Sequence, residues 1–148
     1  MVVDSARADE APFLADCYKA MLDEAGLNAG LRPDWHERLI RYFRQGMADD
    51  TQGWFVARGP GGVPYGSACA FLSETSAVHL RPWATLAGVY VKPEMRRRGT
   101  ARSLTEAAIA WAREHDCALV RLTASEPAEA LYRNMGFVPG RELILRLT

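Results

Sequence analysis

Apolar positions in the first third of the chain recur at helical spacing. They predict a helix over 13–25, ended by Gly26, because glycine readily adopts the left-handed conformation that closes helices. A second helix is expected to start at Asp34, an N-cap candidate with Glu37 three residues further on. The apolar sides of the two helices carry Leu14, Cys17, Tyr18, Met21, Leu22 and Ala25, and Leu39, Tyr42 and Phe43.

The middle of the chain has the short apolar runs of strands. The pattern predicts a strand at 54–57, a turn at 59–62 and a hairpin partner at 65–72. A loop then precedes a further strand at 86–91. This part of the chain is therefore expected to be antiparallel β structure.

The last third alternates between helix and strand. A helix is expected after Gly99, followed by a strand at 118–123, a helix capped by Ser125 and ended by Gly136, and a final strand pair at 137–138 and 143–147. The inner helix faces are Leu104, Ala107, Ala108 and Trp111, and then Ala128, Leu131, Tyr132 and Met135. The order β-α-α-β-β-β-α-β-α-β-β predicts an α/β fold.

Length and charge restrict the function classes. The chain has 148 residues, 49% of them hydrophobic, which predicts a single domain over 1–148. Its 18 basic and 18 acidic residues cancel, so the whole molecule has no attraction for nucleic acid or an anionic membrane. A nucleic-acid-binding protein using 96–98 would bind in a strongly salt-dependent way. We therefore expect neither nucleic acid nor a membrane as a partner.

Cysteine and histidine are used sparsely. Cys17, Cys69 and Cys117 are far apart, without C-x-x-C spacing, which argues against a disulfide framework or a zinc site. His36 and His115 lie near predicted helix ends, where structural roles are common, so no metal is expected. The start of the chain has no leader pattern and no run long enough to span a membrane. These features predict a soluble, cytoplasmic protein.

The most informative segment joins the strand at 86–91 to the following helix. It reads VYVKPEMRRRGTARSL, which combines a strand end, three arginines, Gly99 and a helix start. A helix start carries unpaired N–H groups and a partial positive charge, and glycine lets a ligand approach the backbone. Arginine side chains match phosphate oxygens in geometry. The segment therefore predicts a site for a diphosphate.

Two further patterns decide which kind of site this is. Neither G-x-G-x-x-G nor G-x-x-x-x-G-K-[ST] occurs. The spacing Arg96-x-x-Gly99-x-Ala101 resembles the [Q/R]-x-x-G-x-[G/A] signature of the GNAT superfamily of acetyl-CoA-dependent N-acetyltransferases, and the segment AEALYRNMGF at 128–137 resembles that family's A-x-x-L-Y-x-x-x-G-F signature. The resemblance, with the order of elements, extends over almost the whole chain.

The resemblance implies a fold, a cosubstrate and a reaction. The fold is the GNAT acyl-CoA N-acyltransferase fold, in which the strands at 86–91 and 118–123 are parallel and splay apart to admit pantetheine. Acetyl-CoA is the implied cosubstrate, and the acetyl group passes directly to an amine, since no cysteine lies in the two signature segments. The implied cofactor-binding residues are Val89, Tyr90, Val91, Arg96, Arg97, Arg98, Gly99, Thr100, Ala101, Arg102, Ser103 and Ser125.

Acetyl transfer needs proton movement as well as cofactor placement. By resemblance, Tyr132 protonates the departing thiolate, although its helical face equally suits core packing. Many family members carry a glutamate where this chain has Ala87. Glu74, His79 or a water chain could accept the amine proton instead. The missing carboxylate keeps an alternative open, a non-catalytic acyl-CoA-binding or sensing domain.

The sequence leaves the acceptor open among small-molecule amines, peptides and protein lysines. Trp35, Trp54 and Trp83 either line an acceptor pocket or pack in the core. The resemblance also admits a homodimer, because dimers are common in the family.

Overall fold

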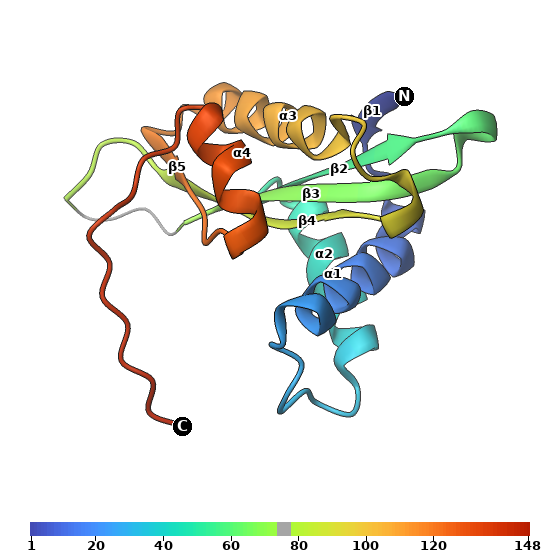
Figure 1. The fold of residues 1–148 in the computed structure, drawn as a ribbon, viewed down its shortest axis with the longest axis horizontal. Coiled ribbons are helices and arrows are strands. Elements are labelled where there is room, and N and C mark those ends of the chain that lie inside the picture. The colour runs from blue at the N-terminus through green and yellow to red at the C-terminus, as the bar shows by residue number, and fades with distance from the viewer. Residues whose placement is uncertain (74–77) are drawn as a thin grey trace.

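A five-stranded sheet forms the centre of the computed structural model, which describes residues 1–73 and 78–148 (Figure 1). The strands follow the sheet in chain order: β1 (Val2–Ser5), β2 (Gln52–Arg58), β3 (Pro64–Leu72), β4 (Trp83–Val91) and β5 (Leu119–Arg121). The first three pairings are antiparallel, and β4 pairs with β5 in parallel. The sheet is therefore mixed, as the sequence predicted.

Helices cover both faces of this sheet. Figure 1 shows α1 (Ala11–Ala25) and α2 (Trp35–Ala48) below it, and α3 (Thr100–Glu114) above it with α4 (Glu129–Asn134). Short 3-10 turns lie at Ala8–Glu10, Pro60–Gly62, Pro93–Met95 and Glu126–Ala128. Among the described residues, no helix is both long enough and apolar enough to cross a membrane.

The core divides between the two faces because side chains alternate along a strand. On the α1 and α2 side, the buried cluster is Leu14, Ala15, Phe43, Trp54, Val56 and Cys69. On the α3 side, the buried residues form two clusters: Ala57, Tyr65, Ala68, Val91 and Leu104, and then Ala70, Leu86, Ala108, Trp111 and Tyr132. Trp54 is thus a core residue rather than part of an acceptor pocket.

An ion pair fastens the start of α1 to the sheet. Arg58 of β2 donates two hydrogen bonds of 2.7 Å to the Glu10 carboxylate and one of 3.1 Å to Asp4. Hydrogen bonding from Arg58 lowers the pKa of Glu10 in spite of the opposing effect of burial. The pair fixes where α1 begins relative to β1 and β2.

Element boundaries differ from the sequence prediction in several places. Gly26 does end α1, with a φ of 69°. Asp34 precedes α2, but its side chain does not cap the helix and instead accepts a hydrogen bond from Arg38 at 2.8 Å. Strand β4 begins earlier than expected, at Trp83, and β5 is shorter than 118–123 because β4 and β5 pair over three residues only.

The predicted C-terminal strand pair is wrong. Residues 137–148 contain no strand, and the chain passes through Pro139 and Gly140 without a turn. Phe137 still packs edge-to-face on Tyr132, with ring centroids 5.7 Å apart, but every residue beyond it is exposed. Figure 1 shows this segment leading away from the sheet. Without a reversal at Pro139 and Gly140 the two halves cannot pair.

Candidate functional site

The site begins where β4 and β5 separate. Three residue pairs join these strands: Trp83 with Leu119, Ala84 with Val120, and Thr85 with Arg121. Beyond them, within the described part of the chain, 86–91 has no strand partner on that edge. The backbone groups there are open to a ligand that pairs like an added strand.

A bulge shapes this free stretch of β4. The register with β3 shifts between Ser67 and Cys69, and Gly88 on β4 has a φ of 62°. The hydroxyl of Ser67, which is fully buried, donates a 2.9 Å hydrogen bond to the Gly88 carbonyl. A Cβ at Gly88 would lie 3.0 Å from the Trp54 ring, and the φ there is one that side chains rarely adopt, so a substitution there would be strained. Bulges re-aim the backbone beside them.

Ser67 was missed at the sequence level. It is a single hydroxyl within the apolar run Gly66–Phe71, and a polar side chain in a buried strand needs a hydrogen-bond partner. That requirement is a usable signal, although it does not name the partner.

The arginine turn, residues 96–99, lies between β4 and the start of α3. Arg97 and Gly99 both have left-handed φ values, 64° and 76°. No side chain caps α3, and the amide of Ser103 is the one that bonds back to the Gly99 carbonyl, at 3.1 Å. The N–H groups ahead of Ser103 therefore lie at an uncapped helix start. A Cβ built at Gly99 meets nothing within 4 Å, so the approach to these groups is clear.

The arginine side chains near this turn have different surroundings. Arg96 donates to the Val91 carbonyl at 2.8 Å and to Glu24 at 2.7 Å, so its side chain braces the turn against α1. Arg102 donates to Glu106 and to Asn134, both at 3.0 Å, which links α3 to α4. Arg97 and Arg98 are exposed, and neither has an ion-pair partner among the described residues.

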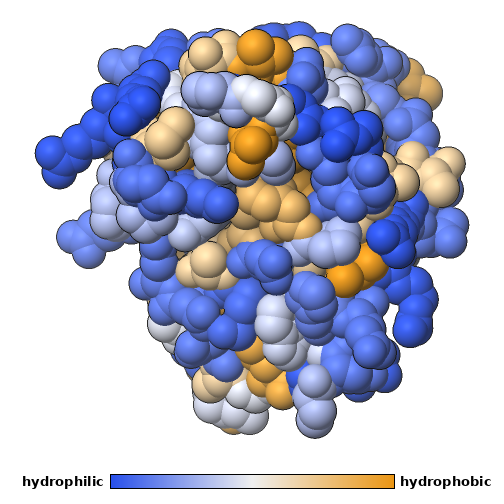
Figure 2. Space-filling view, turned by 90° about the vertical axis from the view of Figure 1, so that its right-hand side faces the viewer, coloured by the Kyte–Doolittle hydropathy of each residue, from blue (hydrophilic) through white to orange (hydrophobic). Residues whose placement is uncertain are grey.

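The turn after β4 lies on the right-hand side of the molecule in Figure 1, and Figure 2 shows that side face-on. On this face, hydrophilic side chains surround a smaller hydrophobic area. Arg97 and Arg98 are thus free cations beside an uncapped helix start, which is where an anion is stabilised.

The other predicted cofactor residues border the same region. Val89 and Val91 pack on the α3 side, whereas Tyr90 lies with Arg96 5.4 Å above its ring. Thr100 is buried, and its hydroxyl is 3.4 Å from that of Tyr65. Ser125 is exposed, and the expected side-chain cap is wrong: its carbonyl, not its hydroxyl, accepts a 3.0 Å bond from Ala128. The Ser125 hydroxyl is therefore not used in capping.

Tyr132 projects from α4 into the cluster between β4 and α3. It is 8% exposed and packs with Leu86 and Trp111. Burial raises the pKa of its hydroxyl, and a hydrogen bond with Thr105 opposes that shift only partly. The side chain therefore stays protonated at neutral pH and can act as a proton donor.

Among the described residues, no candidate base lies at the bulge. Ala87 is half-buried and offers no base, and Glu74 lies outside the described residues. His79 is exposed and rests on Trp83, with ring centroids 5.1 Å apart, at the end of β4 away from the arginine turn. Next to Gly88 lie Trp54 and Tyr18, and burial raises the pKa of Tyr18.

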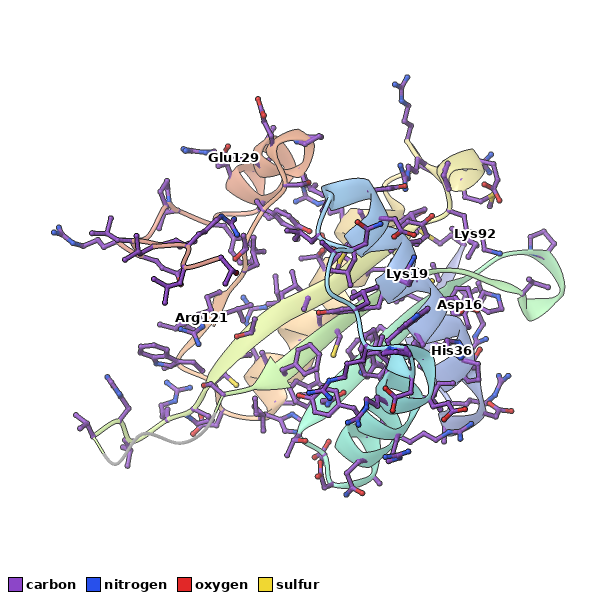
Figure 3. All side chains as sticks on the ribbon, turned by 90° about the horizontal axis from the view of Figure 1, so that it is seen from below. Asp16, Lys19, His36, Lys92, Arg121 and Glu129 are labelled. Carbon is purple, nitrogen blue, oxygen red and sulfur yellow. The ribbon has the colours of Figure 1, made fainter. Side chains whose placement is uncertain are left out.

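Figure 3 shows charged residues on both sides of the place where β4 and β5 separate. Arg121 of β5 and Glu129 of α4 lie on one side, and Lys92 with the labelled residues of α1 and α2 on the other. On the α1 and α2 side, the Nε2 of His36 lies 3.1 Å from the carboxylate of Asp16. Across 1–73 and 78–148, no group of three or more metal-ligating side chains occurs.

The cysteines are poor nucleophiles. Burial raises the pKa of the Cys17 thiol to about 11 and raises that of Cys69 and Cys117 above the ordinary value. Thiolate is the reactive form, so these side chains are largely unreactive near neutral pH.

Solved structures share this architecture. A predicted acetyltransferase from Clostridium acetobutylicum, solved with acetyl-CoA, is 20% identical, with a TM-score of 0.86 over 99% of this chain and 96% of the other. A GCN5-related N-acetyltransferase from Ralstonia eutropha JMP134 is 23% identical, with a TM-score of 0.78 over 99% and 97%. AAC(6')-Iy in complex with the bisubstrate analog CoA-S-monomethyl-acetylneamine is 20% identical, with a TM-score of 0.76 over 99% and 97%.

At these identities the solved structures establish the fold. None of the curated proteins matches the chain by sequence. The model of the acetyltransferase (GNAT) family matches residues 14–137, which include β4, the arginine turn and Tyr132. The separation of β4 from β5 and the uncapped start of α3 agree with this family match. The chain therefore belongs to the GNAT acetyltransferase family.

Proposed function

We propose that residues 1–148 form one N-acetyltransferase domain, which transfers an acetyl group from acetyl-CoA directly to a primary amine in the cytoplasm. The observation that carries this proposal is the free edge of β4, which leads straight into the uncapped start of α3. One continuous segment thus offers backbone partners for pantetheine and an anion site for the diphosphate.

Cofactor binding follows from that geometry. Pantetheine lies along Val89–Val91, and the diphosphate lies over 96–103, with the N–H groups from Gly99 onward and the free cations Arg97 and Arg98 as its partners. Arg96 and Arg102 contribute through backbone position, since their side chains already bind Glu24, Glu106 and Asn134. Ser125 reaches the pantetheine from the α4 side.

The acyl transfer then needs few side chains. The amine nitrogen attacks the thioester carbonyl, the C–N bond forms and the C–S bond breaks. A backbone N–H beside the Gly88 bulge stabilises the negative oxygen. Tyr132 gives its proton to the leaving thiolate. Because the neighbours of Gly88 are Trp54 and Tyr18, which are not bases at neutral pH, the amine proton passes to solvent water.

The acceptor is proposed as an amine on a small molecule or a peptide. The fold likeness to AAC(6')-Iy, solved with a CoA analogue of an acetylated amine, supports a small molecule. Arg121 is in the last residue pair before β4 and β5 part, and its guanidinium lies 5.5 Å from the centroid of the Trp83 ring, so these two side chains are candidates for the acceptor wall.

Release of free CoA thiol, measured over a panel of amines, tests the proposal. We expect thiol release that depends on both acetyl-CoA and one class of amine, and a mass gain of one acetyl group on that amine. The absence of Glu at Ala87 favours a second candidate, a non-catalytic acyl-CoA-binding domain. Tight acetyl-CoA binding by calorimetry, with no thiol release above the spontaneous rate for any amine, would establish that candidate instead.

A further inference from the structure

The first half of β4 is fully covered on one face only. Side chains alternate along a strand, so Ala84 and Leu86 face one side of the sheet and Trp83, Thr85 and Ala87 face the other. Ala84 and Leu86 are buried on the α3 side, whereas the other three are only half-buried. The buried cluster beneath α1 and α2 takes its strand residues from β2 and β3. This part of β4 is therefore partly open on the α1 and α2 side.

The side chain of Arg121 lies on this open face. Arg121 of β5 is opposite Thr85 in the last residue pair before the two strands separate. Its Nε donates a 3.4 Å hydrogen bond to the Thr85 hydroxyl, and its guanidinium carbon lies 5.5 Å from the centroid of the Trp83 ring. Because Trp83 and Thr85 face the α1 and α2 side, the guanidinium is on that side too. Figure 3 shows Arg121 clear of both helices.

This guanidinium is held in place without a carboxylate. Arg58, which also lies on a strand, binds Glu10 and Asp4. Arg121 is exposed and has no acidic partner among the described residues. Its bond to Thr85 uses one of the five N–H donors of the side chain, and the contact with the indole uses none. The remaining donors and the whole positive charge are therefore available to an anion.

The open face leads from the free guanidinium to the proposed reaction centre. Thr85 precedes Gly88 by three residues, which is about 10 Å of extended strand. Between them the side chain on this face is that of Ala87, which is small and leaves room for a ligand. Tyr18 of α1 bounds the far end, 3.5 Å from where a Cβ of Gly88 would lie. Because α3 covers the opposite face, an amine reaches the thioester from this side.

We infer that the acceptor is a small-molecule amine that also carries a carboxylate or a phosphate, and that Arg121 binds this anion about 10 Å from the nitrogen that is acetylated. The inference rests on the proposed acetyl transfer and names the chemical class of its second substrate. Either anion accepts two parallel hydrogen bonds from a guanidinium. A second ammonium group at the same place meets a like charge, so diamines bind less well than anionic amines of equal length.

Thiol release from acetyl-CoA with matched acceptors tests the substrate class. The probes are unbranched ω-amino acids of four to eight carbons, ω-aminoalkyl phosphates, and the alkylamines and diamines of the same lengths. We expect the highest kcat/KM for the longer anionic amines, and the two anions show which group fits better. Equal values for anionic amines and alkylamines, or the highest values for diamines, overturn the inference. Thiol release with none of the amines overturns the proposed acetyl transfer, and this inference with it.

Arg121→Glu tests the residue itself. The reversed charge should raise the KM for the preferred anionic amine by roughly 10-fold or more, with kcat unchanged, because the anion lies away from the bond that forms. The constants for the alkylamine should stay the same, and diamines should become better acceptors.

Two variants serve as controls for this reversal. Arg121→Lys keeps the charge and should keep the preference for anionic amines. Arg113→Glu makes the same reversal at an exposed position of α3 and should behave like the parent chain. Circular dichroism should show the parent fold in each variant. If Arg121→Glu impaired the alkylamine and the anionic amine equally, Arg121 would serve only to support Trp83, and the inference would be wrong.

Discussion

His115 and Asp50 join α3 to the turn before β2. The Nε2 of His115 lies 2.8 Å from the Asp50 carboxylate, and its Nδ1 lies 2.8 Å from the Trp111 carbonyl. Both partners accept hydrogen bonds, so the protonated imidazole, which donates from both ring nitrogens, fits these two contacts best. Burial opposes this charge, but the two hydrogen bonds outweigh it and raise the pKa of His115. The C-terminal end of α3 also favours a cation.

A raised pKa in the folded state fixes the sign of a pH effect. The His115 contribution is fully present below the unfolded pKa of about 6.5 and is lost as the pH rises through the folded pKa. We therefore expect the free energy of unfolding, measured by urea denaturation, to fall as the pH rises from 6 to 8. The decrease should be at most about 1 kcal/mol, as is usual for a partly exposed pair.

Asp50→Asn should flatten this pH dependence. Asp116→Asn is a matched control, because Asp116 also has a left-handed φ and pairs with an arginine, Arg81, instead of a histidine. Its effect on stability should stay constant over the same pH interval. An unchanged slope in Asp50→Asn would contradict the assignment of the cation to this pair.

Ser67→Ala tests whether the bulge positions the cofactor. Loss of the hydroxyl leaves the Gly88 carbonyl without its partner, at a cost of about 1–3 kcal/mol. We expect kcat/KM for acetyl-CoA to fall by roughly 10-fold or more, because the free edge of β4 loses its orientation. Ser73→Ala is the control, since Ser73 makes the same kind of bond, 2.8 Å to the Trp83 carbonyl, at the other end of β4. Equal losses in both variants would point to general destabilisation.

Arg97→Ala/Arg98→Ala should weaken cofactor binding selectively. These side chains are free cations, and a charge-assisted hydrogen bond contributes about 1.5–3 kcal/mol, so the KM for acetyl-CoA should rise by roughly 10-fold or more while that for the amine stays unchanged. The salt dependence of acetyl-CoA affinity should shrink as well. Arg41→Ala/Arg113→Ala removes the same charge elsewhere and should change neither KM. Arg96→Ala, which removes a brace, should instead lower the melting temperature.

Gly99→Ala separates backbone strain from ligand approach. A Cβ at a φ of 76° costs about 1–2 kcal/mol of stability, although no atom of the protein is close enough to clash. If phosphate lies over Gly99, calorimetry should show a sharp fall in acetyl-CoA affinity. Gly61→Ala has nearly the same φ, 73°, and equally open space, at the hairpin between β2 and β3. It should lose similar stability and keep the affinity; parallel behaviour of the two variants would remove Gly99 from the site.

Local patterns predicted most of the fold. Gly26 ends α1 and Gly99 precedes α3, and both positions have the left-handed φ that glycine adopts readily. The helical spacing of apolar residues located the two helices themselves. The caps at Asp34 and Ser125 were wrong because a polar side chain near a helix start has several partners available, and Arg38 competes for Asp34. The C-terminal strand pattern is genuine in sequence, but pairing depends on a partner edge that local spacing cannot specify.

The candidate site was predictable in its backbone and less so in its side chains. The segment from Val89 to Ser103 is contiguous, so one motif locates it. The arginine side chains within it have different partners: Arg96 binds Glu24, whereas Arg97 is free. This difference depends on α1, which is distant in sequence. Ser67 lies on the neighbouring strand β3, and its contact with Gly88 forms only when β3 and β4 pair with the register shift at the bulge.

Tyr132→Phe tests the proton donor with the least disturbance. The ring that packs on Leu86 and Trp111 is kept and only the hydroxyl is lost, so the stability and the affinity for acetyl-CoA should barely change. The thiolate develops in the transition state, so the loss should appear in kcat. General acid catalysis contributes about 10²-fold or more, but a thiol with a pKa of about 8.5 leaves readily, and we expect a decrease nearer 10-fold.

Because burial raises the pKa of Tyr132, its proton remains available above neutral pH, and the decrease in the variant should persist as the pH rises towards 9. Thiol release under single-turnover conditions, with a confirmed amine acceptor, measures the chemical step directly. Tyr42→Phe, which removes an exposed hydroxyl from α2, is the control and should have the parent rate. A chemical step equally fast in Tyr132→Phe would leave water as the donor, and Tyr132 would then serve only to pack α4 against β4 and α3.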